Sequence, residues 1–184
     1  THYKLFVFDL DGTLRSCKAH GGPCHNGPFE WVLYPDVPAV LAQYDWNALS
    51  LGIATNQAGI GLGYAPISTV RSQIYMTLHA ALHGCRPYSL HINICPHKPD
   101  EQCVCRKPMP GMLLWTMHRA EAPPEETVFV GDSLEDAQAA DAARCAFVPA
   151  YEFFGRQKPV WATWTQDERD TAYREVAATG GRLA

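Results

Sequence analysis

The sequence predicts a three-layer α/β/α sandwich around a mainly parallel β-sheet, and three observations support that prediction. Short segments rich in β-branched and aromatic residues recur along residues 3–149, and segments with helical periodicity lie between them. The β-prone segments are nearly continuous apolar runs, as is typical of strands that helices cover on both faces. Regular alternation of such strands with helices favours a layered α/β fold.

Five segments are predicted to form the strands of the sheet. They cover residues 3–8, 49–55, 89–94, 127–132 and 144–149. The first, YKLFVF, runs directly into Asp-Leu-Asp-Gly, and the fourth, TVFVGD, ends at an aspartate. All five runs are only six or seven residues long, which suits strands better than helices.

Four helices are predicted between the strands, over residues 35–45, 66–84, 110–122 and 133–143. The second shows the clearest periodicity, with apolar residues three and four apart at Ile67, Val70, Ile74, Leu78 and Leu82. Gly84 is a plausible stop for it. Asp36 and Ser133 are predicted N-caps of the first and last helices, and Pro38 fits a first helical turn.

The remaining segments show no periodicity, apart from one predicted helix near the C-terminus. Residues 15–30 are rich in Gly, Pro and polar residues and are predicted to form a long loop. Residues 156–184 form a predicted C-terminal extension with a helix over about 166–178. A chain of 184 residues suits one packed core, so we expect a single domain over residues 1–184.

Composition narrows the class of protein. No apolar run reaches membrane-spanning length, and the seven cysteines are odd in number, with three crowded into residues 95–105. This pattern favours a reducing compartment with a metal site over a disulfide framework, and we expect a cytoplasmic protein without a membrane partner. The net charge of −4 and the absence of Lys/Arg runs argue against a nucleic-acid partner.

Polar side chains follow several of the predicted strands. Asp9, Asp11, Thr55 and Asp132 stand at strand ends, and Arg106 and Lys107 follow one loop after the third strand. Because ligands of open α/β sheets bind outside the carboxyl ends of the strands, these groups are expected to share one edge. Carboxylates, a hydroxyl and two cations suit Mg²⁺ together with a phosphate.

Four short motifs carry a resemblance to a known family. DLDGT at 9–13, TNQAG at 55–59, a lysine and GDSLED at 131–136 occur in this order on the predicted elements. As a set they resemble the four motifs of the haloacid dehalogenase superfamily of phosphohydrolases, over about residues 5–150. The segment CPHKPDEQCVCRKP at 95–108 is similar to the small cap-less branch that includes heptose bisphosphate and histidinol phosphate phosphatases. The resemblance implies a Rossmann-like sheet.

The resemblance also implies roles for the aspartates. Asp9 would be the nucleophile that forms an aspartyl-phosphate. Mg²⁺ would bind the Asp9 side chain, the backbone carbonyl of Asp11 and the side chain of Asp132. The Asp11 carboxyl would protonate the leaving oxygen and then activate water. Taken singly, each aspartate could be an ordinary turn or cap residue; their joint occurrence favours a catalytic site.

Four further residues complete the implied site. The Thr55 hydroxyl and the Lys107 ammonium would hold the transferring phosphoryl oxygens, because this chemistry depends on positioning and charge stabilisation. Asn56 and Arg106 would reach the rest of the substrate. Singly, Thr55 could be a helix cap, and Arg106 with Lys107 a solvated pair.

Three thiols and one imidazole are predicted to hold a structural zinc ion. The ligands are Cys95, His97, Cys103 and Cys105. Such a set suits tetrahedral Zn²⁺ with every position filled by protein, and zinc would supply the free energy that orders a loop with little apolar surface. The zinc loop, residues 95–105, would then aim the basic pair that follows it at the phosphate. Free thiols or a Cys103/Cys105 redox pair are the alternatives.

A second zinc site is a weaker hypothesis. Its ligands would be Cys17, His20, Cys24 and His25. Their spacing is irregular, which favours ordinary loop residues over metal ligands.

The predicted function is Mg²⁺-dependent hydrolysis of a small phosphorylated metabolite. RKPMPGML and GDSLEDAQAA are similar to the heptose-phosphatase subfamily and favour a heptose-type phosphate, whereas the five-residue spacer inside the zinc loop favours histidinol phosphate. Leu10 and Ser133 stand where relatives usually carry arginine and lysine, and both departures remove positive charge.

Two further functions agree with part of the sequence. The 3'-phosphatase of polynucleotide kinases shares D-x-D-G-T and T-N-Q but lacks the zinc loop, and its substrate does not suit an acidic chain. A non-enzymatic zinc module would require the loss of a catalytic residue, and all of them are present.

Overall fold

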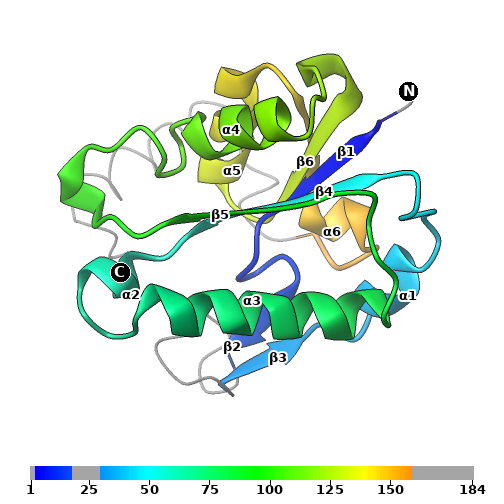
Figure 1. Cartoon of the computed structure of the whole chain (residues 1–184), viewed down its shortest axis with the longest axis horizontal. Coiled ribbons are helices and arrows are strands. Elements are labelled where there is room, and N and C mark those ends of the chain that lie inside the picture. The colour runs from blue at the N-terminus through cyan, green and yellow to red at the C-terminus, as the bar shows by residue number, and fades with distance from the viewer. Residues whose placement is uncertain (1–2, 18–29, 159–184) are drawn as a thin grey trace.

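A parallel sheet of five strands forms the centre of the molecule in the computed structural model, which describes residues 3–17 and 30–158 (Figure 1). The strand order is β5-β4-β1-β6-β7, and every neighbouring pair is parallel. The strands are β1 (Leu5–Phe8), β4 (Ser50–Asn56), β5 (Leu90–Cys95), β6 (Thr127–Gly131) and β7 (Ala146–Pro149). The predicted fold class and the five predicted strands are confirmed.

The order of the strands determines where a ligand can bind. From β1 the chain moves to β4 and β5 on one side, and then returns past β1 to β6 and β7 on the other. The carboxyl end of β1 therefore lies at the point where the direction of winding reverses. In open α/β sheets the loops separate at this point and leave a crevice.

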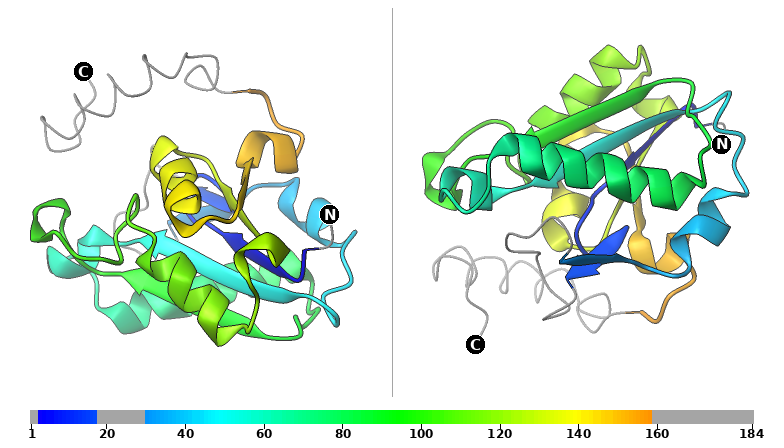
Figure 2. Two further views of the ribbon diagram at one scale, coloured as in Figure 1. Left: turned by 90° about the horizontal axis from the view of Figure 1, so that it is seen from above. Right: turned by 60° about the horizontal axis from the view of Figure 1, so that its bottom comes forward.

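Helices cover both faces of the sheet, as Figures 1 and 2 show. One face carries α1 (Val37–Leu41), α3 (Ile67–Leu82) and α6 (Ala150–Phe153), and the other carries α4 (Gly111–Arg119) and α5 (Leu134–Ala143). Helix α2 (Ala58–Gly61) follows β4, and two short 3-10 helices span Pro99–Glu101 and Pro124–Glu126. The four predicted helices are confirmed, with α1 and α4 shorter than predicted.

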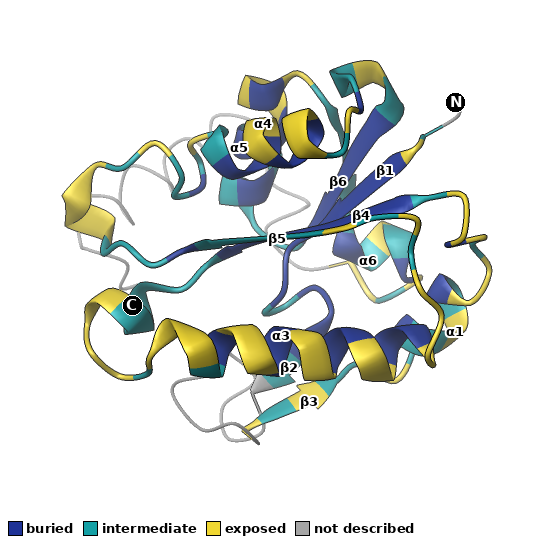
Figure 3. Ribbon diagram, in the orientation of Figure 1, coloured by how far each residue is buried: buried dark blue, intermediate teal, exposed yellow. Residues whose placement is uncertain are grey.

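The strand residues divide the core between the two faces. Along β1, Phe6 and Phe8 pack with α1, α3 and α6, whereas Leu5 and Val7 pack with α4 and α5. All four side chains are buried, which is visible in the dark ribbon of β1 in Figure 3. Burial of each such side chain contributes about 1.5–3 kcal/mol. The central strand, and with it the position of Asp9, is thereby held from both sides.

The predicted loop over residues 15–30 is wrong at its start, where residues 15–17 form a strand, and a second strand that was not predicted begins directly after residue 30. Strand β2 (Arg15–Cys17) pairs antiparallel with β3 (Trp31–Leu33), outside the main sheet. Strands of three residues are too short to show an alternating pattern, so these two strands could not be recognised from their residues. Residues 18–29, including three of the four ligands of the second zinc hypothesis, lie outside the described residues, as does the predicted helix at 166–178.

The helix ends agree with the prediction in part. Ser133 caps α5 and accepts a hydrogen bond from the backbone N–H of Asp136 at 3.2 Å. Asp36 occupies the N-cap position of α1, but its side chain makes no capping bond and instead pairs with Arg156. Helix α3 ends one residue before the left-handed His83. No helix within the described ranges is long and apolar enough to cross a bilayer.

Candidate active site

The candidate site begins where β1 ends. Asp9 is buried, and its backbone N–H donates to the carbonyl of Val130 on β6 at 2.9 Å. The chain then forms a tight loop in which the N–H groups of Leu14 and Arg15 both donate to the carbonyl of Leu10. This loop places Asp11 beside the end of the sheet, two residues after Asp9.

Gly12 allows that loop to lie against the end of β6. Its φ of +95° lies in the left-handed region, and a Cβ atom there would overlap the carboxylate of Asp132. The glycine of the DLDG motif is thus required by both conformation and space. It brings the first and fourth motifs into direct contact.

Lys107 links Asp9 to α5. Its Nζ lies 2.5 Å from Asp9 Oδ1 and 2.6 Å from Asp136 Oδ1, and all three side chains are buried. Its backbone is held by Asn56, whose Oδ1 accepts from the Lys107 N–H at 3.0 Å and whose Nδ2 donates to the Lys107 carbonyl at 3.1 Å. Three distant segments of the chain meet at this ammonium group.

Burial and neighbouring charges shift the pKa values of Asp9, Asp132 and Lys107. Burial raises the pKa of Asp9 well above its ordinary value, opposed by Lys107 and reinforced by the carboxylates of Asp136 and Asp132. Burial also raises the pKa of Asp132, to about 6. Burial alone would lower the pKa of Lys107, but the carboxylates of Asp136 and Asp9 raise it. The lysine is therefore charged, and the aspartates favour binding of a further cation.

Asp136 is a site residue that the sequence analysis missed. Its Oδ2 accepts from the backbone N–H groups of Asp132 and Ser133 at 3.1 and 3.0 Å, and from the Ser133 hydroxyl at 2.7 Å. One carboxylate thus caps α5, and its other oxygen faces Lys107. Asp136 is the last residue of the GDSLED motif, in which the sequence analysis assigns roles only to Asp132 and Ser133.

The carboxylates of Asp9, Asp132 and Asp136 form a group that could hold a metal ion. One oxygen from each lies within 4.8 Å of the others. Mg²⁺ takes oxygen ligands and is usually bound through one or two carboxylates, so the donor set fits. The Asp11 carboxylate does not join this group: it accepts from Arg15 Nε at 2.7 Å and from Gln57 Nε2 at 2.8 Å.

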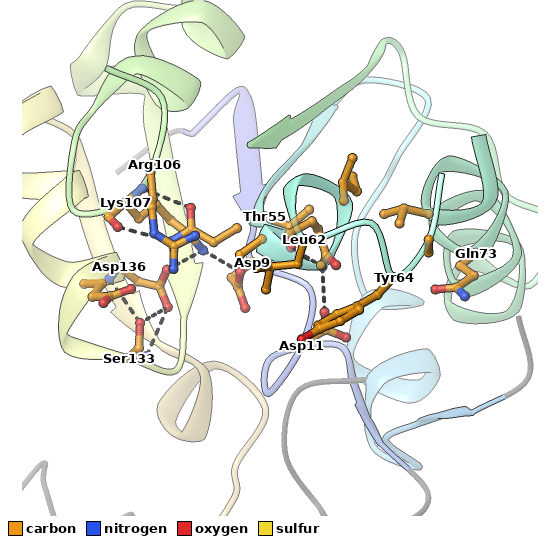
Figure 4. Close-up of a pocket in the computed structure, with 18 of the residues that line it drawn as sticks. Asp9, Asp11, Thr55, Leu62, Tyr64, Gln73, Arg106, Lys107, Ser133 and Asp136 are labelled. Atoms are coloured by element: carbon orange, nitrogen blue, oxygen red, sulfur yellow. Dashed lines mark hydrogen bonds and ion pairs between the residues drawn. The ribbon is translucent and has the colours of Figure 1, made fainter. Parts of the chain in front are cut away.

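These residues line a cleft of about 420 Å³ at the carboxyl edge of the sheet, shown in Figure 4. Asp9 lies in the middle, with Lys107 and Asp136 on one side and Tyr64 on the other. Among the described residues, five carboxylates and two cations line it: Asp9, Asp11, Asp132, Glu135, Asp136, Arg106 and Lys107. A phosphate would be repelled by this excess of negative charge unless a divalent cation were bound as well.

Thr55 lies at the end of β4, on the wall of the cleft. Its hydroxyl accepts from Gln57 Nε2 at 2.9 Å, and its side chain is almost completely buried. Gln57 therefore bonds both Thr55 and Asp11 through one amide nitrogen. Nothing in the sequence distinguished Gln57 from an ordinary residue of the TNQAG motif.

The predicted zinc ligands converge beside this cleft. The sulfur of Cys95 lies 3.6 Å from that of Cys103 and 3.4 Å from that of Cys105. His97 Nδ1 lies 3.6 Å from the Cys95 sulfur and 3.2 Å from the Cys105 sulfur. Zinc–sulfur bonds of about 2.3 Å would place two sulfurs of a tetrahedron roughly 3.8 Å apart, so the four donors fit a zinc ion. Cys85, Cys95, Cys103, Cys105 and Cys145 are free thiols.

The zinc loop is bonded directly to the residues that follow it. The backbone N–H of Arg106 donates to the Cys103 sulfur at 3.3 Å, and Arg106 Nη1 donates to the His97 carbonyl at 3.3 Å. Burial opposes ionisation of Cys103, but the Arg106 N–H and the neighbouring thiols lower its pKa to about 7. A thiol that ionises near neutrality is suited to metal binding.

The structure brings the predicted catalytic, substrate-binding and magnesium residues together around one cleft. They are Asp9, Asp11, Thr55, Asn56, Arg106, Lys107 and Asp132. Of the two residues that depart from the family pattern, Leu10 is fully buried in the core, whereas Ser133 lines the cleft.

Comparison with known proteins gives consistent matches. The family model described as polynucleotide kinase 3 phosphatase matches residues 4–165. A D-glycero-beta-D-manno-heptose-1,7-bisphosphate 7-phosphatase of Bordetella bronchiseptica is 36% identical over 146 residues, which is 78% of this chain and 78% of the relative. The enzyme of the same name from Pseudomonas putida is 40% identical over 74% of this chain and 76% of the relative.

Other relatives differ in the anomer that their names give, and solved structures share the fold. A D-glycero-alpha-D-manno-heptose-1,7-bisphosphate 7-phosphatase of Mycobacterium bovis is 32% identical over 80% of this chain and 79% of its own length. The crystal structure of D,D-heptose 1,7-bisphosphate phosphatase from B. bronchiseptica, complexed with magnesium and phosphate, matches with a TM-score of 0.66 and 28% identity. That match covers 95% of this chain and 99% of the relative.

Proposed function

From the premise that the chain belongs to the family described as polynucleotide kinase 3 phosphatase and to the haloacid dehalogenase-like heptose-1,7-bisphosphate 7-phosphatases, we propose that it hydrolyses the 7-phosphate of a heptose 1,7-bisphosphate. The observation that carries the proposal is the buried Asp9 at the end of β1, paired with Lys107 inside a cleft that Asp11 also lines. This arrangement presents a carboxylate nucleophile, a cation and a second carboxylate to one substrate.

Asp9 performs the first step of the proposed reaction. One of its oxygens attacks phosphorus, a bond from Asp9 to phosphorus forms, and the bond to the leaving sugar oxygen breaks. The Lys107 ammonium forms an ion pair with Asp9 and stabilises the negative charge at the reacting oxygens. Thr55 lines the same cleft and offers its hydroxyl to a phosphoryl oxygen.

Asp11 moves the protons. Its carboxyl gives a proton to the leaving oxygen, and in the second step it takes a proton from the water that attacks the aspartyl-phosphate. Arg106 faces the cleft and binds the more distant part of the substrate. Asn56 lines the cleft while its amide holds the backbone of Lys107, and we assign it both a positioning and a substrate-binding role.

We assign two metal ions to the protein. The Asp9 and Asp132 side chains and the Asp11 carbonyl would hold Mg²⁺, which supplies positive charge to the phosphoryl oxygens. The excess of carboxylates in the cleft and the magnesium in the solved relative support this assignment.

A structural Zn²⁺ would be held by Cys95, His97, Cys103 and Cys105, and the distances between these donors support this assignment. The free thiols fit a cytoplasmic protein.

A substitution at the nucleophile tests the chemistry. Asp9→Asn is expected to abolish Mg²⁺-dependent release of phosphate from an aryl phosphate and from the sugar substrate, because an amide cannot form the acyl phosphate. Asp141→Asn, at an exposed position of α5, is the matched control and should retain full activity. Retained turnover by Asp9→Asn would refute the assignment of the nucleophile.

A comparison of substrates tests the specificity. The α and β anomers of the bisphosphate, histidinol phosphate and a 3'-phosphorylated oligonucleotide are assayed for kcat/KM. One of the two anomers is expected to exceed the other substrates by at least about tenfold, which corresponds to roughly 1.4 kcal/mol of differential binding in the transition state.

A nucleic-acid 3'-end is the second candidate substrate, because a family model described by that activity matches most of the chain. The net charge of −4 opposes it. A higher kcat/KM for the oligonucleotide than for either sugar bisphosphate would replace the heptose proposal.

A further inference from the structure

Arg15 is a buried cation beside the cleft that the proposed reaction does not use. It begins β2, and only 1% of its surface is exposed. Its Nε donates to Asp11 Oδ1 at 2.7 Å, its Nη1 donates to the Thr77 hydroxyl on α3 at 3.3 Å, and its guanidinium lies 5.7 Å from the ring centre of Trp31 on β3. A buried guanidinium is costly unless an anion compensates it, and Asp11 is the partner that the structure provides.

The opposite side of the Asp11 carboxylate is also bonded. Gln57 Nε2 donates to Asp11 Oδ2 at 2.8 Å and to the Thr55 hydroxyl at 2.9 Å. Each oxygen of Asp11 therefore has its own donor, one from β2 and one from the segment after β4. A carboxylate bonded on both oxygens has a defined orientation, and its side chain still lines the cleft with 15% of its surface exposed.

We propose that Arg15 is a positioning residue for proton transfer: it orients the Asp11 carboxyl toward the leaving oxygen and toward the water that follows. The inference rests on the proposed function, in which Asp9 forms a bond to phosphorus as the bond to the leaving oxygen breaks. The proton on Asp11 then moves to that oxygen. In hydrolysis, a water oxygen bonds to phosphorus, the Asp9–phosphorus bond breaks, and the proton released from water returns to Asp11.

The surroundings of Arg15 suit this task. Thr77 belongs to α3, which packs on the core, and its hydroxyl also donates to the Gln73 carbonyl at 2.9 Å. Trp31 approaches from β3, the partner strand of β2. The guanidinium is therefore supported by two elements outside the main sheet. A general acid must be held in a fixed orientation toward the atom that it protonates, and a buried guanidinium that is itself held in place can fix the Asp11 carboxyl in this way.

A structural role and a positioning role predict different kinetics. Loss of an arginine with a purely structural role would lower kcat/KM by the same factor for all substrates. Loss of orientation at Asp11 would slow only those steps that need its proton. An alkyl phosphate needs protonation of its leaving oxygen, whereas p-nitrophenolate leaves without a proton. The value of kcat/KM reports steps up to departure of the leaving group and so separates the two cases.

The experiment compares Arg15→Met with wild type on a sugar phosphate and on p-nitrophenyl phosphate. We expect kcat/KM to fall about 100-fold for the sugar phosphate, the scale of general acid catalysis. For p-nitrophenyl phosphate it should change by no more than about threefold. Because the aspartyl-phosphate is then hydrolysed slowly, a pre-steady-state burst of nitrophenolate should appear. Arg71→Met, at an exposed position of α3, is the matched control.

Two further variants keep the test independent of folding. Thr77→Val preserves shape but removes one support of Arg15, so it should show the same dependence on leaving group with a smaller loss. Asp11→Asn leaves Arg15 buried without its anion and should lower the Tm by about 10 °C, and adding Arg15→Met should restore most of that loss. This second comparison measures the pairing without any assay of activity.

The results of these experiments distinguish failure of the positioning role of Arg15 from failure of the proposed phosphatase function. Equal losses on both substrates in Arg15→Met and Thr77→Val, or no loss in either, would overturn the positioning role. Hydrolysis that is absent in wild type, or an Asp11→Asn variant without any dependence on leaving group, would instead overturn the proposed function, and the inference with it. A dependence on leaving group in both Asp11→Asn and Arg15→Met supports the inference.

Discussion

The chemistry of the site depends on single residues that the fold holds in an unfavourable environment. Asp9, Lys107 and Asp136 are buried at the end of the sheet, where each charge is stable only because the others are present. Asp136 connects this triad to the N-terminus of α5 through its bonds to Asp132 and Ser133. A change at any member is therefore expected to affect stability as well as activity.

Lys107→Met tests this dependence. It leaves two carboxylates buried without their cation, and we expect a loss of about 3–5 kcal/mol in the free energy of unfolding together with loss of activity. Urea denaturation measures the stability. Lys4→Met is the matched control, because Lys4 pairs with Glu126 at the surface, where a pair contributes less than about 1 kcal/mol. Equal stability of the two variants would contradict the account.

The affinity for Mg²⁺ should depend on pH. Burial raises the pKa of Asp132 to about 6, and it also raises the pKa of Asp9. As the pH falls through 6, the Asp132 carboxylate binds a proton, which competes with the metal. Calorimetric titration with Mg²⁺ should show a nearly constant affinity above pH 7 and a progressive loss below pH 6. An affinity that is unchanged from pH 7 to pH 5 would show that these carboxylates do not hold the ion.

At the scale of elements, the zinc loop and α4 act together. The proposed zinc ligands Cys103 and Cys105 are followed directly by Arg106 and Lys107. The backbone N–H of Gly111, at the start of α4, donates to the Val104 carbonyl at 3.1 Å. A Cβ atom at Gly111 would overlap that carbonyl. The loop is thus packed directly on the first turn of the helix. Its order should determine where the basic pair lies.

Cys103→Ser tests the metal dependence of this element. Removing one thiolate should reduce bound zinc from one ion to well below one per chain, and the Tm should fall because binding of structural zinc contributes on the order of 10 kcal/mol to the folded loop. Zinc is measured by atomic absorption and Tm by calorimetry. Cys85→Ser changes an exposed free thiol outside the cluster and should alter neither quantity. An unchanged zinc content in Cys103→Ser would exclude the cluster as the zinc site.

Elements with a strong local signal were predictable, and those defined by tertiary contacts were not. The apolar run before Asp9 and the periodicity of α3 identify a strand and a helix without other information. The β2–β3 hairpin escaped prediction because each strand has three residues and its partner is distant in the chain. Helix α5 was predicted with its cap, since Ser133 and an acidic first turn mark it.

At the scale of the whole molecule, the strand order explains why motifs so far apart in the chain form one site. Parallel strands direct all their carboxyl ends to one edge, so Asp9, Thr55 and Asp132 could be placed together from the sequence. The contacts among side chains could not. Asp136 pairs with Lys107 and Arg15 pairs with Asp11 where both Asp136 and Arg15 are buried, and no pattern in the sequence reports burial of a charged residue.

The central claim is that the Asp9 carboxylate becomes phosphorylated during turnover, and chemical trapping measures this directly. The enzyme is mixed with substrate and Mg²⁺, quenched within milliseconds and reduced with borohydride, which converts an acyl phosphate into the corresponding alcohol. Peptide mass spectrometry should find homoserine at position 9 and aspartate at positions 11, 132 and 136. Homoserine at another position, or unchanged Asp9 under conditions where phosphate is released, would contradict the account.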